Sequence, residues 1–132
     1  MSDYAFELPI YGMIKQTKSN RNAAMTFNWC RAAKCWTYDE AKKKFKKHME
    51  PQIKQFDPID LKIRIKYVYY AKRKGTDLDN FVSVVKKFFQ DSLSEHGFIP
   101  DDNTSYIIKS SEEYGGIDRE NPRVMAYITI LE

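Results

Sequence analysis

Residues 60–80 decide the fold, and they read DLKIRIKYVYYAKRKGTDLDN. From Leu61 to Tyr67, large apolar side chains alternate with cations. One face of an extended chain carries Leu61, Ile63, Ile65, Tyr67 and Tyr69, and the other carries Lys62, Arg64 and Lys66. This period of two predicts a strand over residues 60–70 with one buried face. Residues 72–76 are polar and contain a glycine, so we expect the chain to leave the sheet there.

Three further strands are expected around this one. A short strand over residues 5–10 belongs at a sheet edge, because Pro9 has no N–H to donate to a ladder. Residues 106–109 and 123–131 predict the last two strands, joined by a loop with two glycines. Residues 15–28 have weak periodicity and predict a long loop.

Two helices complete the predicted elements. The first is capped by Thr37 or Asp39 and is expected to stop at Pro51. The second covers residues 79–95 and has a continuous apolar face. The order strand, helix, strand, helix, strand, strand predicts an α+β fold, in which two main helices pack on a mixed β-sheet. At this length we expect a single domain over residues 1–132.

The chain is basic, with a net charge of +4 and a pI near 9.0. Its cations gather at residues 42–47, along residues 62–66 and at residues 72–74. For any single cluster an ordinary solvated face is the simpler interpretation. The three together favour a partner with a phosphate backbone.

Composition also bears on the class of protein and its compartment. The hydrophobic content of 42% is typical of a globular protein. No stretch approaches the roughly 18 apolar residues that cross a bilayer, so we expect no membrane contact. Cys30 and Cys35 are too few for a disulfide framework, and we expect reduced thiols in a cytoplasmic protein.

Four aspartates near the second helix are the candidate chemical site. Asp77 and Asp79 project to the same side if their backbone is extended. A turn at Pro100 is expected to bring Asp101 and Asp102 back towards the same place. Clustered carboxylates repel one another unless they are protonated or hold a cation, and Mg²⁺ prefers such oxygen ligands. The alternative is that the first pair caps the helix and the second pair forms a turn.

These residues belong to an ordered set of short motifs: a basic run, Asp-Leu-Asp-Asn, a helical lysine, Asp-x-Leu, glycine with an aromatic residue, and an Asp-Asp pair. They occur here as Lys72-Arg73-Lys74, Asp77-Leu78-Asp79-Asn80, Lys87, Asp91-Ser92-Leu93, Gly97-Phe98 and Asp101-Asp102. Residues 72–102 therefore resemble the RusA family of Holliday-junction resolvases, which are endodeoxyribonucleases of phages and prophages.

The resemblance implies a role for each matching residue. Asp77, Asp79 and Asp102 would bind Mg²⁺, which Mn²⁺ could replace, and Asp101 is a further candidate beside them. Asn80 would support that site. Lys72, Arg73 and Lys74 would contact DNA. No organic cofactor is expected.

The catalytic lysine is less directly assigned. In the family it usually falls three residues after the asparagine, where this chain has Ser83. Lys87 stands one helical turn later, as though four residues had been inserted near the start of the helix. Lys86 competes with it for the role.

The activity implied by the resemblance is Mg²⁺-dependent resolution of four-way DNA junctions, by symmetric phosphodiester hydrolysis in recombination and repair. A homodimer with two-fold symmetry would supply two sites for two symmetric nicks. Three alternatives stay open: a nuclease of the same chemistry acting on flaps or other branched DNA, a non-catalytic basic nucleic-acid-binding module, and a structural or interaction protein.

Overall fold

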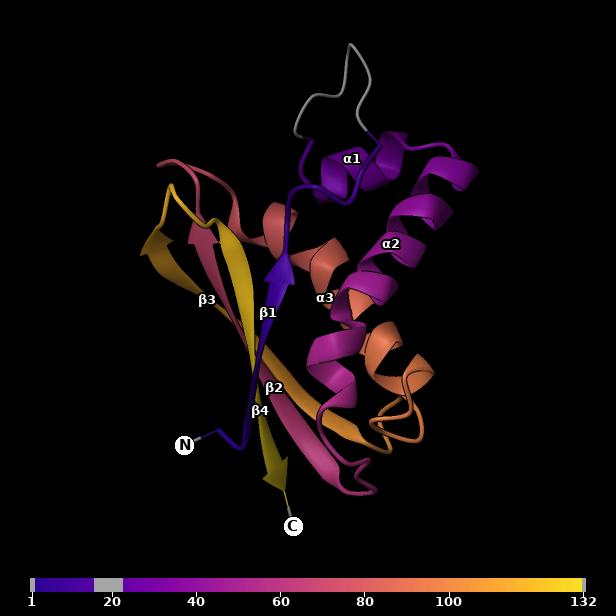
Figure 1. The fold of residues 1–132 in the computed structure, drawn as a ribbon. Helices are drawn as coiled ribbons and strands as arrows, with labels where there is room; N and C mark the ends of the chain where they lie inside the picture. The colour runs from indigo at the N-terminus through magenta and orange to yellow at the C-terminus, as the bar shows by residue number, and fades with distance from the viewer. Residues whose placement is uncertain (1, 16–22, 132) are drawn as a thin grey trace.

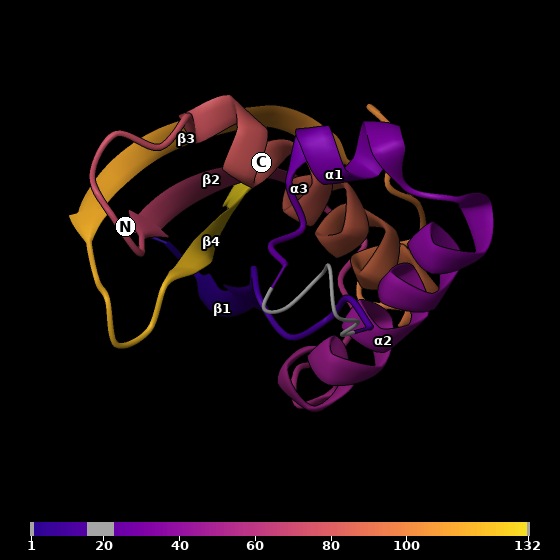
Figure 2. The same cartoon turned by 90° about the horizontal axis from the view of Figure 1, so that it is seen from above.

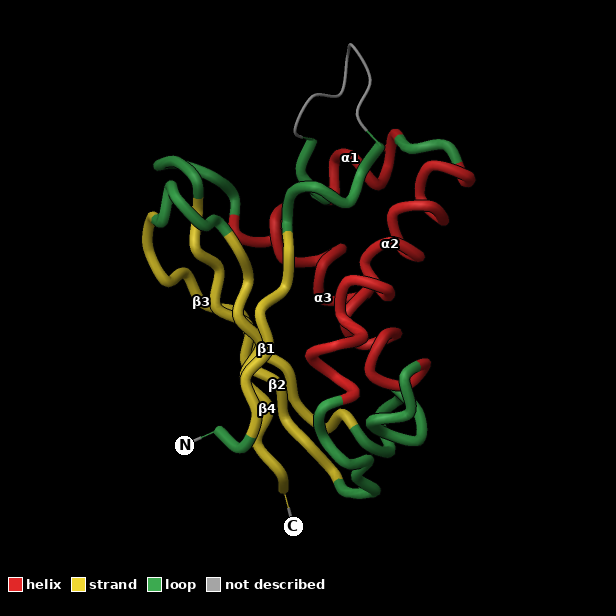
Figure 3. The backbone as a smooth tube through the Cα atoms, viewed as in Figure 1, coloured by secondary structure: helices red, strands yellow, loops and turns green. Residues whose placement is uncertain are grey.

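The computed structural model of the chain describes residues 2–15 and 23–131. Within them the elements follow in the order β1 (Tyr4–Pro9), α1 (Phe27–Ala32), α2 (Cys35–Lys54), β2 (Lys62–Ala71), α3 (Leu78–Glu95), β3 (Ile107–Ile117) and β4 (Arg123–Leu131). The strands form one sheet in the order β1-β4-β2-β3, and the helices gather on one side of it (Figures 1 and 3). The predicted α+β fold is confirmed.

Strand β2 lies inside the sheet, as its alternation predicts. It pairs antiparallel with β4 and parallel with β3, and α3 makes the connection from β2 to β3. Tyr67 and Tyr69 face the helices and are buried, with the Tyr67 ring against Phe89 and the Tyr69 ring stacked on Phe81. Leu61 precedes the strand and is 46% exposed. The buried face of the strand therefore begins at Ile63, two residues later than predicted.

Helix α3 supplies much of the core. Its buried side chains are Val82, Val84, Val85, Phe88, Phe89, Ser92 and Leu93. Phe89 reaches Phe6 of β1, and Phe88 packs against Tyr38 and Phe45 of α2. Burying each such ring contributes about 1.5–3 kcal/mol relative to exposure. These contacts hold α3 between the sheet and α2.

Two predictions about helices were wrong. Helix α2 passes through Pro51 and ends at Lys54, although proline removes one backbone hydrogen bond. Met49 and Ile53, on either side of Pro51, are fully buried, and this burial stabilises the last turn. A short helix, α1, also occupies part of the predicted loop, and the Thr26 hydroxyl caps it by accepting from Trp29 N at 3.1 Å. Residues 16–22 of that loop lie outside the described residues.

Strand β3 is longer than predicted, because it continues through both glycines to Ile117. A register shift at Tyr69/Tyr70 absorbs the extra residue, so that Tyr70 pairs with Gly116. A Cβ atom at Gly115 would lie 2.7 Å from Val68 Cγ1 and 2.8 Å from Tyr70 Cε1. Glycine at this position therefore lets the strand stay close to β2 rather than end.

Candidate functional site

Asp77 and Asp79 stand at the N-terminal end of α3, where β2 has just ended. Asp77 is the N-cap, and its Oδ1 accepts from Asp79 N at 3.1 Å and from Asn80 N at 3.4 Å. Both aspartates are exposed. Their negative charge is stabilised by the positive end of the helix dipole. The capping alternative raised by the sequence therefore holds for Asp77.

Asn80 supports the neighbouring helix. Its Oδ1 accepts from Asn28 N at 3.0 Å, at the start of α1. On the other side of the site, the Tyr69 hydroxyl and Thr76 Oγ1 are 3.0 Å apart, which fixes the loop before the cap. The N-terminal end of α3 is thus tied to both α1 and the sheet.

Residues 72–74 lie beside these aspartates and are exposed. Lys72 Nζ lies 5.3 Å from the centre of the Tyr11 ring, and in the described part of the chain no ion pair involves any of the three. The carboxyl ends of the parallel strands β2 and β3 meet at this edge, which is the usual ligand-binding edge of such a pair. Free cations here suit an anionic ligand.

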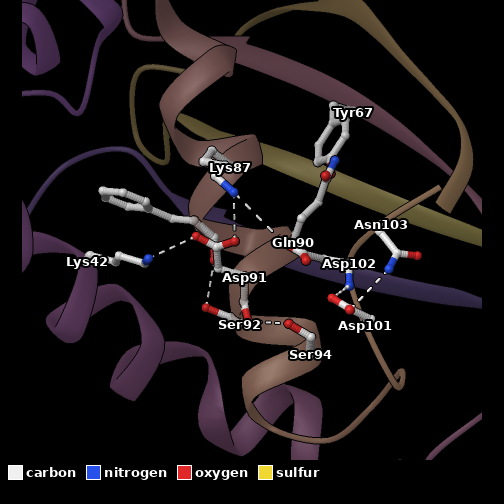
Figure 4. Close-up of polar contacts among 11 residues, drawn as sticks. Lys42, Tyr67, Lys87, Gln90, Asp91, Ser92, Ser94, Asp101, Asp102 and Asn103 are labelled. Carbon is white, nitrogen blue, oxygen red and sulfur yellow. Dashed lines mark hydrogen bonds and ion pairs between the residues drawn. The ribbon is translucent and has the colours of Figure 1, made fainter. Parts of the chain in front are cut away.

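A second polar cluster lies on the C-terminal half of α3 (Figure 4). Asp91 accepts from Lys42 of α2 and from Lys87 one turn away, both at 3.0 Å. Lys87 Nζ is also 3.9 Å from Asp102 Oδ2. Lys87 and Asp91 are residues i and i+4 of one helix, a spacing at which such pairs form and which is visible in the sequence. The contact of Lys42 with Asp91 could not be predicted, because no local pattern relates residues of two helices that are far apart in the sequence.

The pKa values of the two carboxyls in this cluster are shifted in opposite directions. A hydrogen bond to Asp91, with burial, raises the pKa of Asp102 above its usual value. Burial also acts to raise the pKa of Asp91, but hydrogen bonds with Asp102, Lys87 and Lys42 outweigh it and lower that pKa. The pair therefore prefers a proton on Asp102 and a charge on Asp91.

Asp101 and Lys86 are engaged elsewhere. Asp101 Oδ1 accepts from Asp102 N at 2.7 Å, and its Oδ2 accepts from Asn103 Nδ2 at 3.1 Å. These bonds form a turn, as the alternative interpretation of this aspartate pair predicts. Lys86 forms an ion pair with Glu112 of β3 at 2.9 Å and lies over the Tyr67 ring. Of the two candidate lysines, Lys87 is the one that contacts the aspartate cluster.

The expected convergence of the aspartates does not occur within one chain. Because β2 and β3 are parallel, α3 carries the chain back along the sheet, and Asp102 comes just before β3 begins. At about 1.5 Å per helical residue, Asp77 and the Asp91–Asp102 pair are about 20 Å apart. No group of three His, Cys, Asp or Glu side chains in residues 2–15 and 23–131 is arranged to hold a metal ion. The three aspartates of a single copy therefore do not fit one Mg²⁺ ion.

No family model and no curated protein matches this chain. Among the residues that the structure describes, no helix is both long enough and apolar enough to span a membrane.

Proposed function

We propose that this protein is a metal-dependent endodeoxyribonuclease that acts on branched DNA, with four-way junctions as substrate, as the resemblance to RusA resolvases implies. The observation that carries the proposal is at the N-terminal end of α3, where exposed Asp77 and Asp79 stand a few residues after three exposed cations. Mg²⁺ is commonly held by one or two carboxylates together with substrate phosphate. A basic run beside two carboxylates is therefore suited to bringing a phosphodiester to a metal.

We further propose that a second copy of the chain completes the site. Strand β3 is at the edge of the sheet and most of its residues are exposed. Two β3 edges paired antiparallel across a two-fold axis would set the start of one strand beside the end of the other. Asp102 of one copy would then face the end of α3 that bears Asp77 and Asp79 in the other copy. The homodimer predicted from the resemblance thus gains a chemical reason.

The first test is cleavage of a labelled four-way junction and of a matched linear duplex, in Mg²⁺ and in EDTA. The proposal predicts paired nicks in the junction alone, and only with Mg²⁺. Nicking of flaps at the same rate would assign the same chemistry to other branched DNA. Binding without cleavage would remove the nuclease assignment.

The shared site is tested by mixing two inactive variants, Asp79→Asn and Asp102→Asn, after unfolding and refolding them together. In a mixed dimer with shared sites, one site has both substitutions and the other has neither, so single-strand nicking returns. If each chain held its own complete site, both sites would stay damaged and the mixture would be as inactive as its components. Mixing each variant with itself is the matched control.

A non-catalytic nucleic-acid-binding module is the second candidate. It is favoured by the observation that Asp77 caps α3 and that Asp101 and Asn103 form a hydrogen-bonded turn. These roles need no metal. This candidate predicts junction binding that is equal in Mg²⁺ and EDTA, no nicks, and no loss of DNA binding in the Asp79→Asn variant.

A further inference from the structure

The face of the sheet opposite the helices carries a basic surface that the proposed nuclease site does not use. Figure 2 shows the helices on one side of the curved sheet, and within the described residues no helix covers the other side. Arg64 and Lys66 of β2 project to this open side, because their neighbours in sequence face the core. Lys109 of β3 pairs with Arg64, and Tyr127 of β4 pairs with Lys66. We call these four residues the open-face cluster.

The open-face cluster lines a hollow of about 670 Å³. Small side chains make room for it, including Ser2, Ser111 and Thr129. This volume falls within the range of about 300–1,000 Å³ found for ligand pockets. The hollow is partly open and its lining is a mixture of polar and apolar surface, which suits an extended ligand with both charged and apolar groups.

The charge of the hollow is positive. Its lining has three cations, Arg64, Lys66 and Lys109, and a single carboxylate, Glu113, which lies 3.4 Å from Lys66 Nζ. Arg64 and Lys109 form no ion pair with any residue in the described part of the chain. A second copy of this face would bring the same cations against each other, so the surface disfavours self-association and favours a polyanion.

Three tyrosines line the hollow, Tyr70, Tyr114 and Tyr127. The Tyr114 ring lies 6.2 Å from that of Tyr69, whose side chain faces the helices. Tyr70 is packed against Gly115, and the Arg123 guanidinium lies 4.3 Å from its ring centre. Tyr127 is half-buried, and its partner on β1 is the small Ala5. Part of the Tyr127 side chain is therefore accessible, next to Lys66. Cations with an accessible aromatic ring are what proteins use to bind single strands, whose bases stack on the ring.

We propose that the open face binds single-stranded DNA, with phosphates at Arg64, Lys66 and Lys109 and a base stacked on Tyr127. An unpaired strand fits better than a duplex, because a broad sheet face does not enter a groove and the flat faces of paired bases are hidden in the stack. The choice of DNA rests on the proposed function. The surface would hold an unpaired strand near a branch, away from the proposed nuclease site at the N-terminal end of α3.

The test is binding of a fluorescent oligothymidylate, followed by anisotropy in EDTA, where no cleavage occurs. The variant Arg64→Gln/Lys66→Gln is compared with Lys43→Gln/Lys47→Gln, which removes the same charge from exposed positions of α2. The open-face variant should bind more weakly, and its slope of log affinity against log salt should fall by about 1.4, or about 0.7 per lost phosphate contact. Equal losses in the two variants, or none in either, would overturn the proposal.

Stacking is tested separately at Tyr127. Tyr127→Phe should bind like the unmodified protein, whereas Tyr127→Thr, which suits a strand but has no ring, should bind at least about fivefold more weakly. Equal binding by the Phe and Thr variants would overturn the stacking. The urea midpoint of each variant shows whether it is folded. If Tyr127→Thr does not fold, the Arg64→Gln/Lys66→Gln variant decides the proposal. Oligothymidylate binding by Asp79→Asn separates the two proposals, since that variant loses nicking but keeps an intact open face.

Discussion

Two neighbouring carboxyls should respond in opposite ways to the same isosteric substitution. Asp91 accepts from Lys42 and Lys87, and its side chain is only 12% exposed, whereas the two lysine side chains are 37% and 61% exposed. Ion pairs with exposed lysines contribute about 0.5–1 kcal/mol each after solvent screening. Asp91→Asn should therefore lower the free energy of unfolding by about 1–2 kcal/mol at neutral pH. The corresponding fall in melting temperature is about 5 °C.

Asp102→Asn should leave stability unchanged or raise it slightly. An asparagine amide can donate to Asp91 at every pH, as the protonated Asp102 does, and it removes a like charge from beside Asp91. Because the folded state raises the pKa of Asp102, the stability from this proton is present below the unfolded pKa and is lost as pH rises through the folded pKa. The advantage of the asparagine variant should therefore appear as pH rises from about 4 towards neutrality.

The assay is urea unfolding followed by circular dichroism, in steps from about pH 2.5 to neutral pH, with the slope m compared between variants. For Asp91, whose pKa is lowered, the loss in the asparagine variant should be largest at neutral pH and shrink as pH falls through the folded pKa. Equal losses in the two variants, or a larger loss for Asp102→Asn, would refute the assignment of the shared proton. If Asp102→Asn is stable yet inactive on junctions, the residue serves catalysis at a cost to stability.

The remaining predictions concern other parts of the chain. Replacing the cations of residues 72–74 by glutamine should weaken binding to all DNA sequences alike and reduce the salt slope by about 1 per phosphate contact; an unchanged slope in a salt titration would exclude them from the interface. Gly115→Ala should lower the urea midpoint by an amount equivalent to about 1–3 kcal/mol, and adding Val68→Ala should restore part of it; a neutral single variant would contradict the tight approach. Ser83→Ala should be neutral or stabilising, because the buried Oγ of Ser83 has no hydrogen-bond partner among the described residues. Ser92→Ala loses a 2.8 Å bond to the Phe88 carbonyl and should be destabilising. The reverse order of stability in thermal melts would contradict both predictions.

The elements with a strong local pattern were predictable. The alternation in residues 62–67 reports directly which side chains face the core, and the apolar face of α3 does the same at the helical period. Pro9 correctly indicated an edge strand, since β1 is at the end of the sheet. Pro51 misled, because burial of the nearby Ile53 in the tertiary structure outweighs the local preference of proline.

Edges and short elements were less predictable, because their limits depend on pairing partners. Strand β3 has no alternation in its burial, and it continues through two glycines only because β2 is beside it and a bulge absorbs the extra residue. Helix α1 has six residues, too few for a clear period, and its position depends on the contact between Asn28 and Asn80.

For the candidate site, the sequence by itself determined which residues carry the chemistry: the aspartates, the lysine of α3 and the basic run before them. It also determined two of their local contacts, the cap made by Asp77 and the pairing of Lys87 with Asp91 one turn apart. Only the tertiary structure decided which of these residues meet. The parallel pairing of β2 and β3 makes α3 a return path, which separates Asp77 from Asp102 by the length of the helix and brings Lys42 to Asp91. Local periodicity defines faces and ends of elements, but the direction in which strands pair is set by contacts between distant segments, and that direction fixes the geometry of the site.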